Sequence, residues 1–355
     1  MRVLITGGAG FVGSNLAIMF KENHPDASVV ALDNLHRKGS ELNVPRLKAK
    51  GIGFVMGDVR KREDLDALGD ADVLIECSAE PSAFAGFGSS PEYLLDTNLM
   101  GAVNCLEYAR KRNAEFVFLS SSRVYPIKTI NELNYMENDT RFVLDEKQTP
   151  RGVSARGFTE ELATEGSRTL YGTAKLAAEM LIQEYAEMYG LRSVINRCGL
   201  ISGPWQMGKV DQGVIALWVA RHHYGLPLSY IGFGGSGKQV RDVLHVKDLY
   251  TLLEIQLKDV RKHTGEVYNV GGGAERSVSL AELTAICQKY TGRSVPVTSV
   301  PETKAGDIRL YITDNSKVTE KTGWTPSASV EQTVRDVAEW VNEHSAQLKN
   351  VLTQV

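Results

Sequence analysis

The stretch Thr6-Gly7-Gly8-Ala9-Gly10-Phe11-Val12-Gly13-Ser14, read TGGAGFVGS, joins the apolar run RVLIT to the helix-periodic segment SNLAIMFKEN. This context predicts a strand, a tight turn and a helix. Gly7 suits the turn, Gly10 lets the backbone approach a pyrophosphate, and Gly13 lets helix and strand pack closely. The N-terminus of the helix then faces the anion. The stretch therefore predicts a dinucleotide-binding turn.

Asp33 ends the next apolar run, SVVALD. An acidic residue about twenty residues after such a glycine turn binds the ribose hydroxyls of an adenosine. Its negative charge repels a 2′-phosphate, so the sequence favours NAD over NADP. Arg37 and Lys38 follow closely and leave NADP open as an alternative.

Short apolar runs continue to alternate with helical patterns as far as FVFLSS, and again at KLAAEMLIQEYAEMY and RSVINRC. This alternation is typical of βαβ units and hence of a parallel sheet with helices on both faces. The strands are almost wholly apolar, as expected where both faces are covered. We expect an α/β protein with a doubly wound parallel (Rossmann) sheet and a smaller, discontinuous C-terminal substrate lobe.

The pattern weakens after Gly203 into glycine-rich, polar sequence, and helical periodicity returns at LAELTAICQKY. We therefore assign residues 1–203 to the dinucleotide-binding domain, with 240–273 returning to it. Residues 204–239 and 274–355 form the predicted substrate lobe. A long polar connection, 127–170, precedes Tyr171, and connections of this length are usually functional or disordered. A lid over the site and a surface insertion both remain open.

Composition excludes several classes of partner. The net charge of -3 and the pI near 6.2 give no reason to expect a nucleic acid or a membrane surface as partner. No run approaches the roughly 20 apolar residues of a membrane span. The cysteines are widely spaced without a CxxC pair, which indicates a reducing compartment and no metal site. They are Cys77, Cys105, Cys198 and Cys287. We expect a cytoplasmic protein.

Tyr171 and Lys175, in TLYGTAK, lie four residues apart and so share one face of the helix that begins there. The lysine ammonium, together with a cationic nicotinamide, favours the phenolate form of the tyrosine. Such a phenolate is a usable general base near neutral pH. Because the same chain also has a dinucleotide-binding turn, the Tyr171–Lys175 pair predicts a proton-transfer site.

The glycine turn, Asp33, Asp58, SSSRVY, YGTAK and RDVLHV occur together in one chain. In this combination the chain resembles the extended short-chain dehydrogenase/reductase family of nucleotide-sugar enzymes over essentially its whole length. ALDNLHRKGSELN, YMENDTRF, KVDQG and GKQVRDVLHV are more specific, and are similar to the CDP-paratose 2-epimerases, also called CDP-tyvelose epimerases. The resemblance implies bound NAD, a CDP-sugar or another nucleotide sugar as substrate, and a homodimer or homotetramer.

The resemblance also implies roles for single residues. Tyr171 would be the base, Lys175 its partner and the holder of the nicotinamide ribose, and Ser121 the hydroxyl that hydrogen-bonds the reacting sugar oxygen. Asp58 and Val59 match an adenine-contacting pair. The full predicted cofactor set is Gly7, Gly10, Phe11, Val12, Gly13, Asp33, Asn34, Asp58, Val59, Ser78, Ala79, Asn98, Ser120, Tyr171, Lys175 and Arg197.

The predicted substrate contacts lie mostly in the second half of the chain. Arg241 and Arg309 match arginines that grip the nucleotide diphosphate, which suits the bidentate geometry of guanidinium and phosphate. Gln206 and Lys209 lie in a polar loop that could equally be ordinary surface. The full predicted substrate set is Ser122, Arg123, Gln206, Lys209, Gln239, Arg241 and Arg309.

The chain departs from the family pattern at three places. The usual His-x-Ala-Ala after the fourth strand is replaced by the run Glu76 to Ala79, which reads ECSA. The usual Tyr-Gly reads Tyr125-Pro126, and Leu200 stands where many relatives have an asparagine that helps bind the diphosphate. The family's set of nucleotide-binding residues is therefore not fully present in this chain.

The stretch SSSRVYP, from Ser120 to Pro126, decides between reactions. Sugar 4,6-dehydratases of the family have Thr-Asp-Glu before Val-Tyr, because expelling water needs an acid and a base. Ser122 and Arg123 stand at the acidic positions here, and neither can serve in that way. The sequence therefore favours a redox-neutral epimerase.

We thus expect an NAD-dependent epimerase that inverts C2 of a CDP-hexose, of the CDP-paratose/tyvelose or CDP-glucose/mannose type. The reaction would proceed by transient oxidation to a keto sugar and hydride return. That C2 reacts rests on the resemblance alone. A nucleotide-sugar 4-epimerase or a decarboxylase could use the same Tyr-Lys pair, and a non-catalytic NAD-sensing protein on this scaffold is a third reading.

Overall fold

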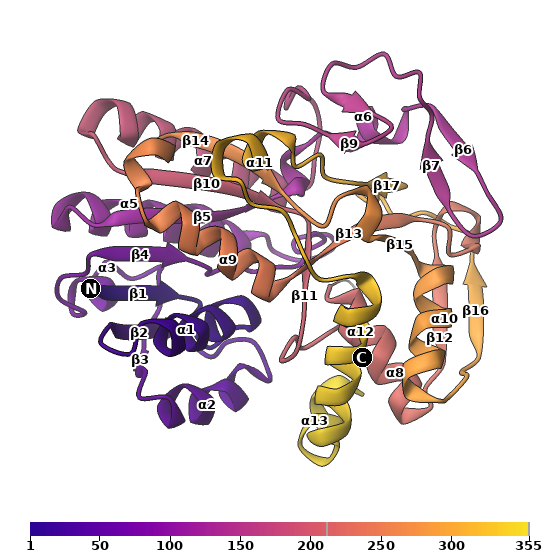
Figure 1. Cartoon of the computed structure of the whole chain (residues 1–355), viewed down its shortest axis with the longest axis horizontal. Helices are drawn as coiled ribbons and strands as arrows, with labels where there is room; N and C mark the ends of the chain where they lie inside the picture. The colour runs from indigo at the N-terminus through magenta and orange to yellow at the C-terminus, as the bar shows by residue number, and fades with distance from the viewer. Residues whose placement is uncertain (211, 354–355) are drawn as a thin grey trace. The chain divides into compact units, whose positions relative to one another are not determined.

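The computed structural model describes residues 1–210 and 212–353. Its largest sheet has seven strands in the order β14-β10-β5-β4-β1-β2-β3 (Figure 1). These strands are β1 Arg2–Thr6, β2 Ser28–Asp33, β3 Gly53–Met56, β4 Val73–Glu76, β5 Glu115–Ser121, β10 Ser193–Cys198 and β14 Glu266–Val270. β4 and β10 are buried along their whole length, because helices cover both faces. The predicted doubly wound α/β sheet is confirmed.

The strand order reverses between β1 and β4. β1 pairs in parallel with β2 on one side and with β4 on the other, and the sheet then grows outward through β3 and β5. Ligands of open α/β sheets bind at such a reversal, beyond the carboxyl ends of the strands. The backbone is packed tightly there, since a Cβ on Gly7 would lie 2.7 Å from the carbonyl oxygen of Cys77.

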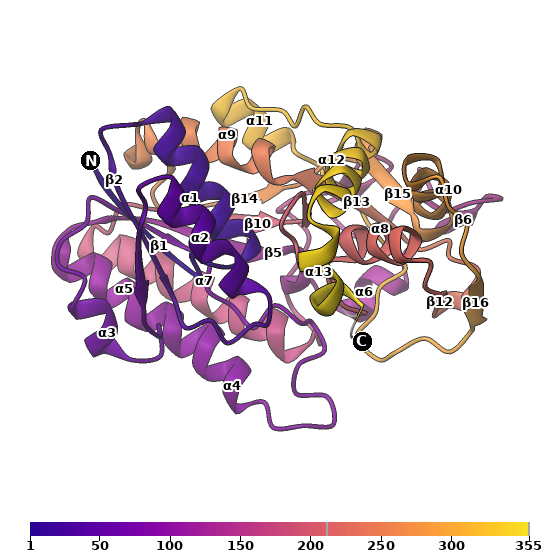
Figure 2. The ribbon, with the colours of Figure 1, turned by 90° about the horizontal axis from the view of Figure 1, so that it is seen from below.

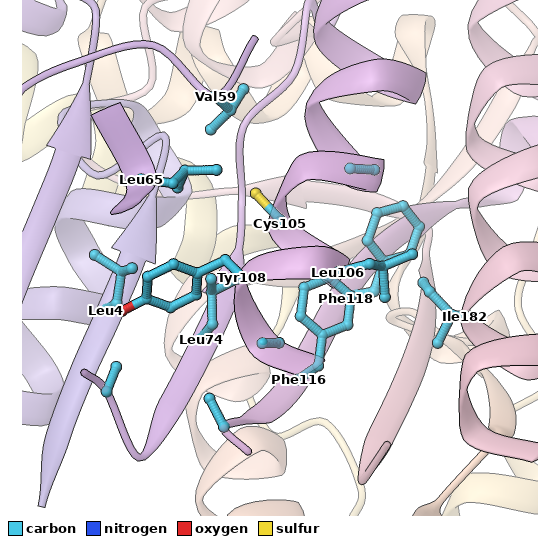
Figure 3. Close-up of a cluster of buried hydrophobic side chains, with 14 of the residues drawn as sticks. Leu4, Val59, Leu65, Leu74, Cys105, Leu106, Tyr108, Phe116, Phe118 and Ile182 are labelled. Atoms are coloured by element: carbon cyan, nitrogen blue, oxygen red, sulfur yellow. The ribbon is translucent and has the colours of Figure 1, made fainter. Parts of the chain in front are cut away.

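Helices cover both faces of this sheet, with α1 and α9 on one face and α3, α5 and α7 on the other (Figures 1 and 2). The helices near the sheet are α1 Phe11–Asn23, α2 Asn43–Ala49, α3 Arg62–Asp66, α4 Glu92–Leu95, α5 Gly101–Arg112, α7 Leu170–Tyr189 and α9 Val246–Leu257. On the face under α5 and α7, apolar side chains form one buried cluster (Figure 3). Phe116 and Phe118 of β5 pack there with Leu106 of α5 and Ile182 of α7.

By their internal contacts, the residues divide into two compact units. The first unit comprises Met1–Val124, Thr169–Arg197 and Tyr250–Tyr268. The second comprises Tyr125–Arg168, Cys198–Leu249 and Asn269–Val355. This division differs from the predicted domain bounds at four places, all of which group with the second unit: residues 125–168, 198–203, 240–249 and 269–273.

Hydrogen bonds within the second unit explain the two longest of these differences, at residues 125–168 and 240–249. The amide of Phe142 donates to the carbonyl of Lys238 at 3.0 Å, and the amide of Phe158 donates to that of Ile312 at 2.8 Å. β13 (Val240–His245) pairs with β11 (Leu200–Ser202), β15 (Ser277–Ser279) and β17 (Leu310–Tyr311). The connection 127–170 therefore has secondary structure and tertiary partners of its own; its role as a lid stays a prediction.

The second unit also carries two short hairpins, a two-stranded parallel pair and several helices. Its remaining elements are α6 Ile127–Asn131, β6 Tyr135–Glu137, β7 Phe142–Leu144, β8 Val153–Ser154, β9 Gly157–Phe158, α8 Val214–Tyr224, β12 Leu228–Ile231, α10 Leu280–Thr291, β16 Val297–Val300, α11 Ser316–Thr322, α12 Val330–Glu343 and α13 Ser345–Leu352. α8 packs against both α10 and α12. Within residues 1–210 and 212–353, no helix combines the length and apolar character that crossing a membrane requires.

Candidate active site

The glycine turn has the backbone geometry that anion binding requires. Gly7 has a φ of +61°, and the amide of Gly10 donates to the Gly7 carbonyl at 2.9 Å. A Cβ on Gly13 would lie 2.3 Å from that same carbonyl oxygen, so no larger residue fits without displacing the turn. α1 begins at Phe11 with no side-chain cap from Gly10. The amides of its first turn, including those of Phe11 and Val12, are therefore available to a phosphate.

Asp33 lies beside this turn at the end of β2. Its carboxylate accepts hydrogen bonds from the amides of Ala9 at 3.0 Å and Leu35 at 2.8 Å. Burial raises the pKa of Asp33, and these backbone hydrogen bonds oppose the rise. The carboxylate is thus anchored to the loop that would hold the pyrophosphate, which is where a ribose-binding acid is expected.

Asp58 forms a second acidic position at the predicted adenine end. Its carboxylate accepts from Asn34 Nδ2 at 3.0 Å and pairs with the guanidinium of Arg60 at 2.6 Å. Although burial alone raises it, the hydrogen bonds from Arg60 and Asn34 bring the pKa of Asp58 to about 2. The Val59 carbonyl accepts from Asn104 at 2.9 Å, and the Val59 side chain joins the core cluster.

Asn98 occupies a π-helical turn, Asp96–Met100, of a kind often found at functional sites. Its side-chain oxygen accepts from the amide of Glu80 at 2.7 Å, and its amide nitrogen donates to the Glu80 carbonyl at 3.0 Å. Asn98 therefore fixes the loop after β4, which carries Ser78 and Ala79. The hydroxyl of Ser78 is buried without a hydrogen-bond partner among the described residues.

The carboxyl end of β5 carries the serines of the SSSRVYP stretch. Ser120 donates to Glu179, and the Ser121 hydroxyl accepts from the amide of Arg123 at 3.1 Å. Ser122 and Arg123 open a single 3₁₀ turn, Ser122–Val124, directly after the strand. Ser121 is therefore held at the end of the strand by the turn that follows it.

α7 brings Tyr171 and Lys175 to this strand end. Thr169 caps the helix by accepting from the amide of Gly172 at 3.3 Å, which makes Tyr171 the second residue of the helix. Tyr171 is half-buried, whereas Lys175 is buried and its ammonium donates to the carbonyl of Leu119 at 3.0 Å. All three predicted catalytic residues thus belong to the first unit, on β5 and on the first turns of α7.

Glu179, one helical turn beyond Lys175, is a member of this region that the sequence analysis missed. Its carboxylate accepts from the Ser120 hydroxyl and forms a bidentate pair with Arg197 of β10, with an N–O distance of 2.7 Å. Both charged side chains are buried. Arg197, predicted to contact the cofactor, therefore also links β10 to α7 and β5. The only feature of the sequence that could have pointed to Glu179 is its position four residues after the lysine of YGTAK, on the same helix face.

These features of the first unit fit a dinucleotide such as NAD. The turn admits no side chain at Gly13, the first helix is uncapped, and the acid that suits a ribose is fixed to the same loop. Gly7, Gly10 and Gly13 would hold the pyrophosphate, and Asp33 the adenosine ribose. Lys175 and Tyr171, on α7, are the members of the predicted cofactor set that would contact the nicotinamide end.

The predicted substrate residues Ser122 and Arg123 belong to the first unit, and the other five to the second. Arg241, on β13, pairs with Asp307 at 3.1 Å and also donates to the carbonyls of Val240 and Ile308. The guanidinium is thus engaged with its own unit. The side-chain amide of Gln206 donates to the Ile201 carbonyl at 3.0 Å, so it stabilises the loop that carries it.

Lys209 is exposed, and its KVDQG stretch includes Asp211, which lies outside the described residues. Gln239 is buried and donates to the Ile231 carbonyl at 2.8 Å. Its side-chain oxygen has no hydrogen-bond partner among residues 1–210 and 212–353. Among these three glutamine and lysine side chains, Lys209 alone is exposed enough to reach a ligand without rearrangement.

Arg309 is surrounded by three aromatic rings. Its guanidinium carbon lies 5.1 Å from the ring centre of Tyr135, 5.2 Å from that of Phe142 and 5.6 Å from that of Phe233. Phe233 has a φ of +49°, an unusual backbone for a bulky residue and one often kept at functional sites. The Nε of Arg309 is buried without a hydrogen-bond partner in the described chain. The rings therefore orient a guanidinium that still has donors to offer.

Residues 3–271 match the model of a family described as the NAD dependent epimerase/dehydratase family. The CDP-paratose 2-epimerase of Salmonella typhi is 30% identical over 350 residues, which cover 96% of this chain and 99% of that protein. The range 3–271 that the family model covers contains the glycine turn, Ser121, Tyr171 and Lys175.

Two solved structures share the fold. The UDP-glucose 4-epimerase of Thermotoga maritima, solved with UDP-glucose, superposes with a TM-score of 0.75 at 26% identity and covers 97% of this chain and 100% of that one. The dTDP-glucose 4,6-dehydratase of Bacillus anthracis, solved with NAD, has a TM-score of 0.76 at 25% identity and covers 99% of both chains.

Proposed function

The chain belongs to the NAD-dependent epimerase/dehydratase family, and from this premise we propose that it is a nucleotide-sugar epimerase that inverts C2 of a CDP-hexose. The extended short-chain dehydrogenase/reductase relationship expected from the sequence is thereby confirmed, and NAD is the cofactor, as the glycine turn and Asp33 predicted. The family contains both epimerases and dehydratases, so the choice between them rests on the site.

The observation that carries the choice is the turn Ser122–Val124 after β5. A dehydratase needs a carboxylic acid and a carboxylate base to expel water. Ser122 and Arg123 occupy that turn, and a guanidinium cannot accept a proton at any working pH. Ser121, Tyr171 and Lys175 remain, and they suffice for a redox-neutral inversion.

NAD, when bound, supplies the acceptor and donor of hydride. Tyr171 takes the proton of the reacting hydroxyl and later returns it, while the Lys175 ammonium favours the phenolate. Ser121 hydrogen-bonds the sugar oxygen and holds it through the keto stage. Because the keto carbon is planar, presenting its other face to the same groups gives the inverted centre.

The substrate class is tested by incubating the purified protein with CDP-, UDP-, GDP- and dTDP-hexoses and identifying the products. We expect a CDP-sugar to be converted into its C2 epimer with no net redox change and no loss of water. Inversion at C4 would identify a 4-epimerase, and release of carbon dioxide a decarboxylase. A 4-keto-6-deoxy product would overturn the argument from Ser122 and Arg123.

Replacing Arg309 with Ala is expected to raise KM for the nucleotide sugar with little change in kcat. A charge-assisted hydrogen bond to a phosphate contributes about 1.5–3 kcal/mol, or roughly 10- to 100-fold in KM. Arg309→Lys should recover only part of the affinity, because an ammonium lacks the bidentate fork. Steady-state kinetics measure both constants.

Arg335→Ala, which removes an exposed arginine from α12 of the same unit, is the matched control and should leave KM unchanged. Arg241→Ala is also expected to raise KM. Since Arg241 pairs with Asp307, Asp307→Asn separates a structural role from substrate binding. An equal rise in KM for Asp307→Asn would assign Arg241 to folding, and an unchanged KM for Arg309→Ala would remove Arg309 from the site.

The homodimer or homotetramer and the cytoplasmic location expected from the sequence stay predictions. They affect neither the proposed chemistry nor the tests above, since the three proposed catalytic residues come from one chain.

A further inference from the structure

Glu76 is a buried carboxylate at the end of β4 to which neither the cofactor nor the proposed mechanism assigns a role. It is 1% exposed, and its Oε2 lies 3.6 Å from the Nζ of Lys175. The Lys175 ammonium also donates to the Leu119 carbonyl and lies 4.5 Å from the ring centre of Phe118. Three groups, from β4 and β5, therefore converge on one ammonium.

Burying a charge is costly unless an opposite charge compensates it. Lys175 and Glu76 are both almost wholly removed from water, and among the described residues each is the ion-pair partner of the other. Burial raises the pKa of the Glu76 carboxyl, and the Lys175 ammonium, followed by the backbone amide of Ser78, opposes that rise. The 3.6 Å separation is an ion-pair distance, too long for a direct hydrogen bond.

The contact is therefore electrostatic and leaves Lys175 free of a fixed second hydrogen bond on that side. Glu76 Oε2 has no hydrogen-bond partner among the described residues. The carboxylate thus attracts the ammonium toward β4 while the Leu119 carbonyl attracts it toward β5. The ammonium therefore lies between attractive groups of both strands.

We propose that Glu76 is a positioning residue that acts through Lys175, holding its ammonium where it serves both the cofactor ribose and the Tyr171 phenol. The inference rests on the proposed role of Lys175. It assigns a purpose to the glutamate that stands where the family pattern has a histidine. It also predicts that Glu76 matters only while Lys175 is present.

A double-mutant cycle tests this dependence with Glu76→Gln, Lys175→Met and the double variant. Two quantities are measured on the NAD-loaded protein: kcat, and the half-time over which bound NAD is released on dilution. Glu76→Gln alone is expected to lower kcat and shorten the half-time by about tenfold, within the coupling of residues in contact. In the Lys175→Met background the same substitution should change neither quantity further.

Glu115→Gln is the matched control, because Glu115 is a partly buried acid paired with Arg192 at the opposite end of the same sheet. It should leave both quantities unchanged. Losses for Glu76→Gln that are equal in both backgrounds would overturn the inference and leave Glu76 a structural residue. An unaltered Lys175→Met enzyme would instead contradict the proposed function, so the two failures are distinguishable.

Glu76→Asp guards against a Gln variant that fails to fold. Its side chain keeps the charge but is one methylene shorter, so the carboxylate lies further from Lys175. We therefore expect kcat and the NAD-release half-time to fall less than in Glu76→Gln. Thermal unfolding of each variant reports its fold independently of activity. Wild-type kcat and NAD release in a folded Glu76→Asp variant would show that the position of the carboxylate does not matter, and would overturn the proposal.

Discussion

Replacing Tyr171 with Phe is expected to lower kcat by about a thousandfold, within the range of a positioned general acid or base. The phenol oxygen is the only atom lost, and Tyr171 lies half-exposed in the first turn of α7, whose Thr169 cap does not involve it. Fold and NAD content should therefore persist. Steady-state kinetics and the nucleotide released on denaturation measure the two quantities.

Tyr189→Phe provides the matched control, because Tyr189 is an exposed tyrosine at the far end of the same helix. Its kcat should equal that of the unaltered protein. Full activity of Tyr171→Phe would remove the tyrosine from the mechanism. A protein that binds NAD but converts no sugar, with or without Tyr171, would favour the non-catalytic NAD-sensing alternative.

The seven-stranded sheet could be predicted because its determinants are local. Strands such as Val73–Glu76 are buried on both faces and read as unbroken apolar runs, and the glycines of the turn have steric reasons that lie within a few residues of one another. The last strand, Glu266–Val270, was not recognised as a separate element, since its sequence EVYNV mixes charged and polar residues with apolar ones.

The bounds of the units could not be predicted, because they depend on partners far apart in the sequence. Residues 125–168 look like a polar insertion, yet Phe142 and Phe158 are hydrogen-bonded by backbone groups of residues 238 and 312. Likewise β13 resembles the apolar strands that precede it, but it pairs with β11, β15 and β17 rather than with the seven-stranded sheet. Strand pairing of this kind leaves no mark in local periodicity.

The same distinction holds within the candidate site. Tyr171 and Lys175 were recognisable because a spacing of four places both on one helix face. Glu76 and Glu179 were not. Lys175, the partner of Glu76, lies about a hundred positions further along the chain, and Arg197, the partner of Glu179, lies on β10 rather than on α7. A buried carboxylate reveals its role only when its counter-charge is located. The aromatic rings around Arg309, drawn from the β6–β7 hairpin and from the distant segment around Phe233, were missed for the same reason.

Turnover in D2O is expected to leave the inverted carbon of the product without deuterium. In the proposed reaction the carbon-bound hydrogen departs as hydride and returns as hydride, so it never enters the pool of exchangeable protons. Substrate carrying deuterium at that carbon should keep its label, and should react more slowly where hydride transfer limits the rate. Mass spectrometry and NMR of the product measure both.

The rival mechanism removes a proton next to an existing carbonyl and delivers another to the opposite face. That route needs two groups able to exchange protons, one on each side of the sugar. Tyr171 is one such group, but the turn after Ser121 offers a serine and an arginine where a second acid would be required. A proton carried by a side chain exchanges with solvent, so this route would place solvent deuterium on the inverted carbon. Stoichiometric incorporation there would refute transient oxidation, even in a chain whose fold and cofactor belong to this family.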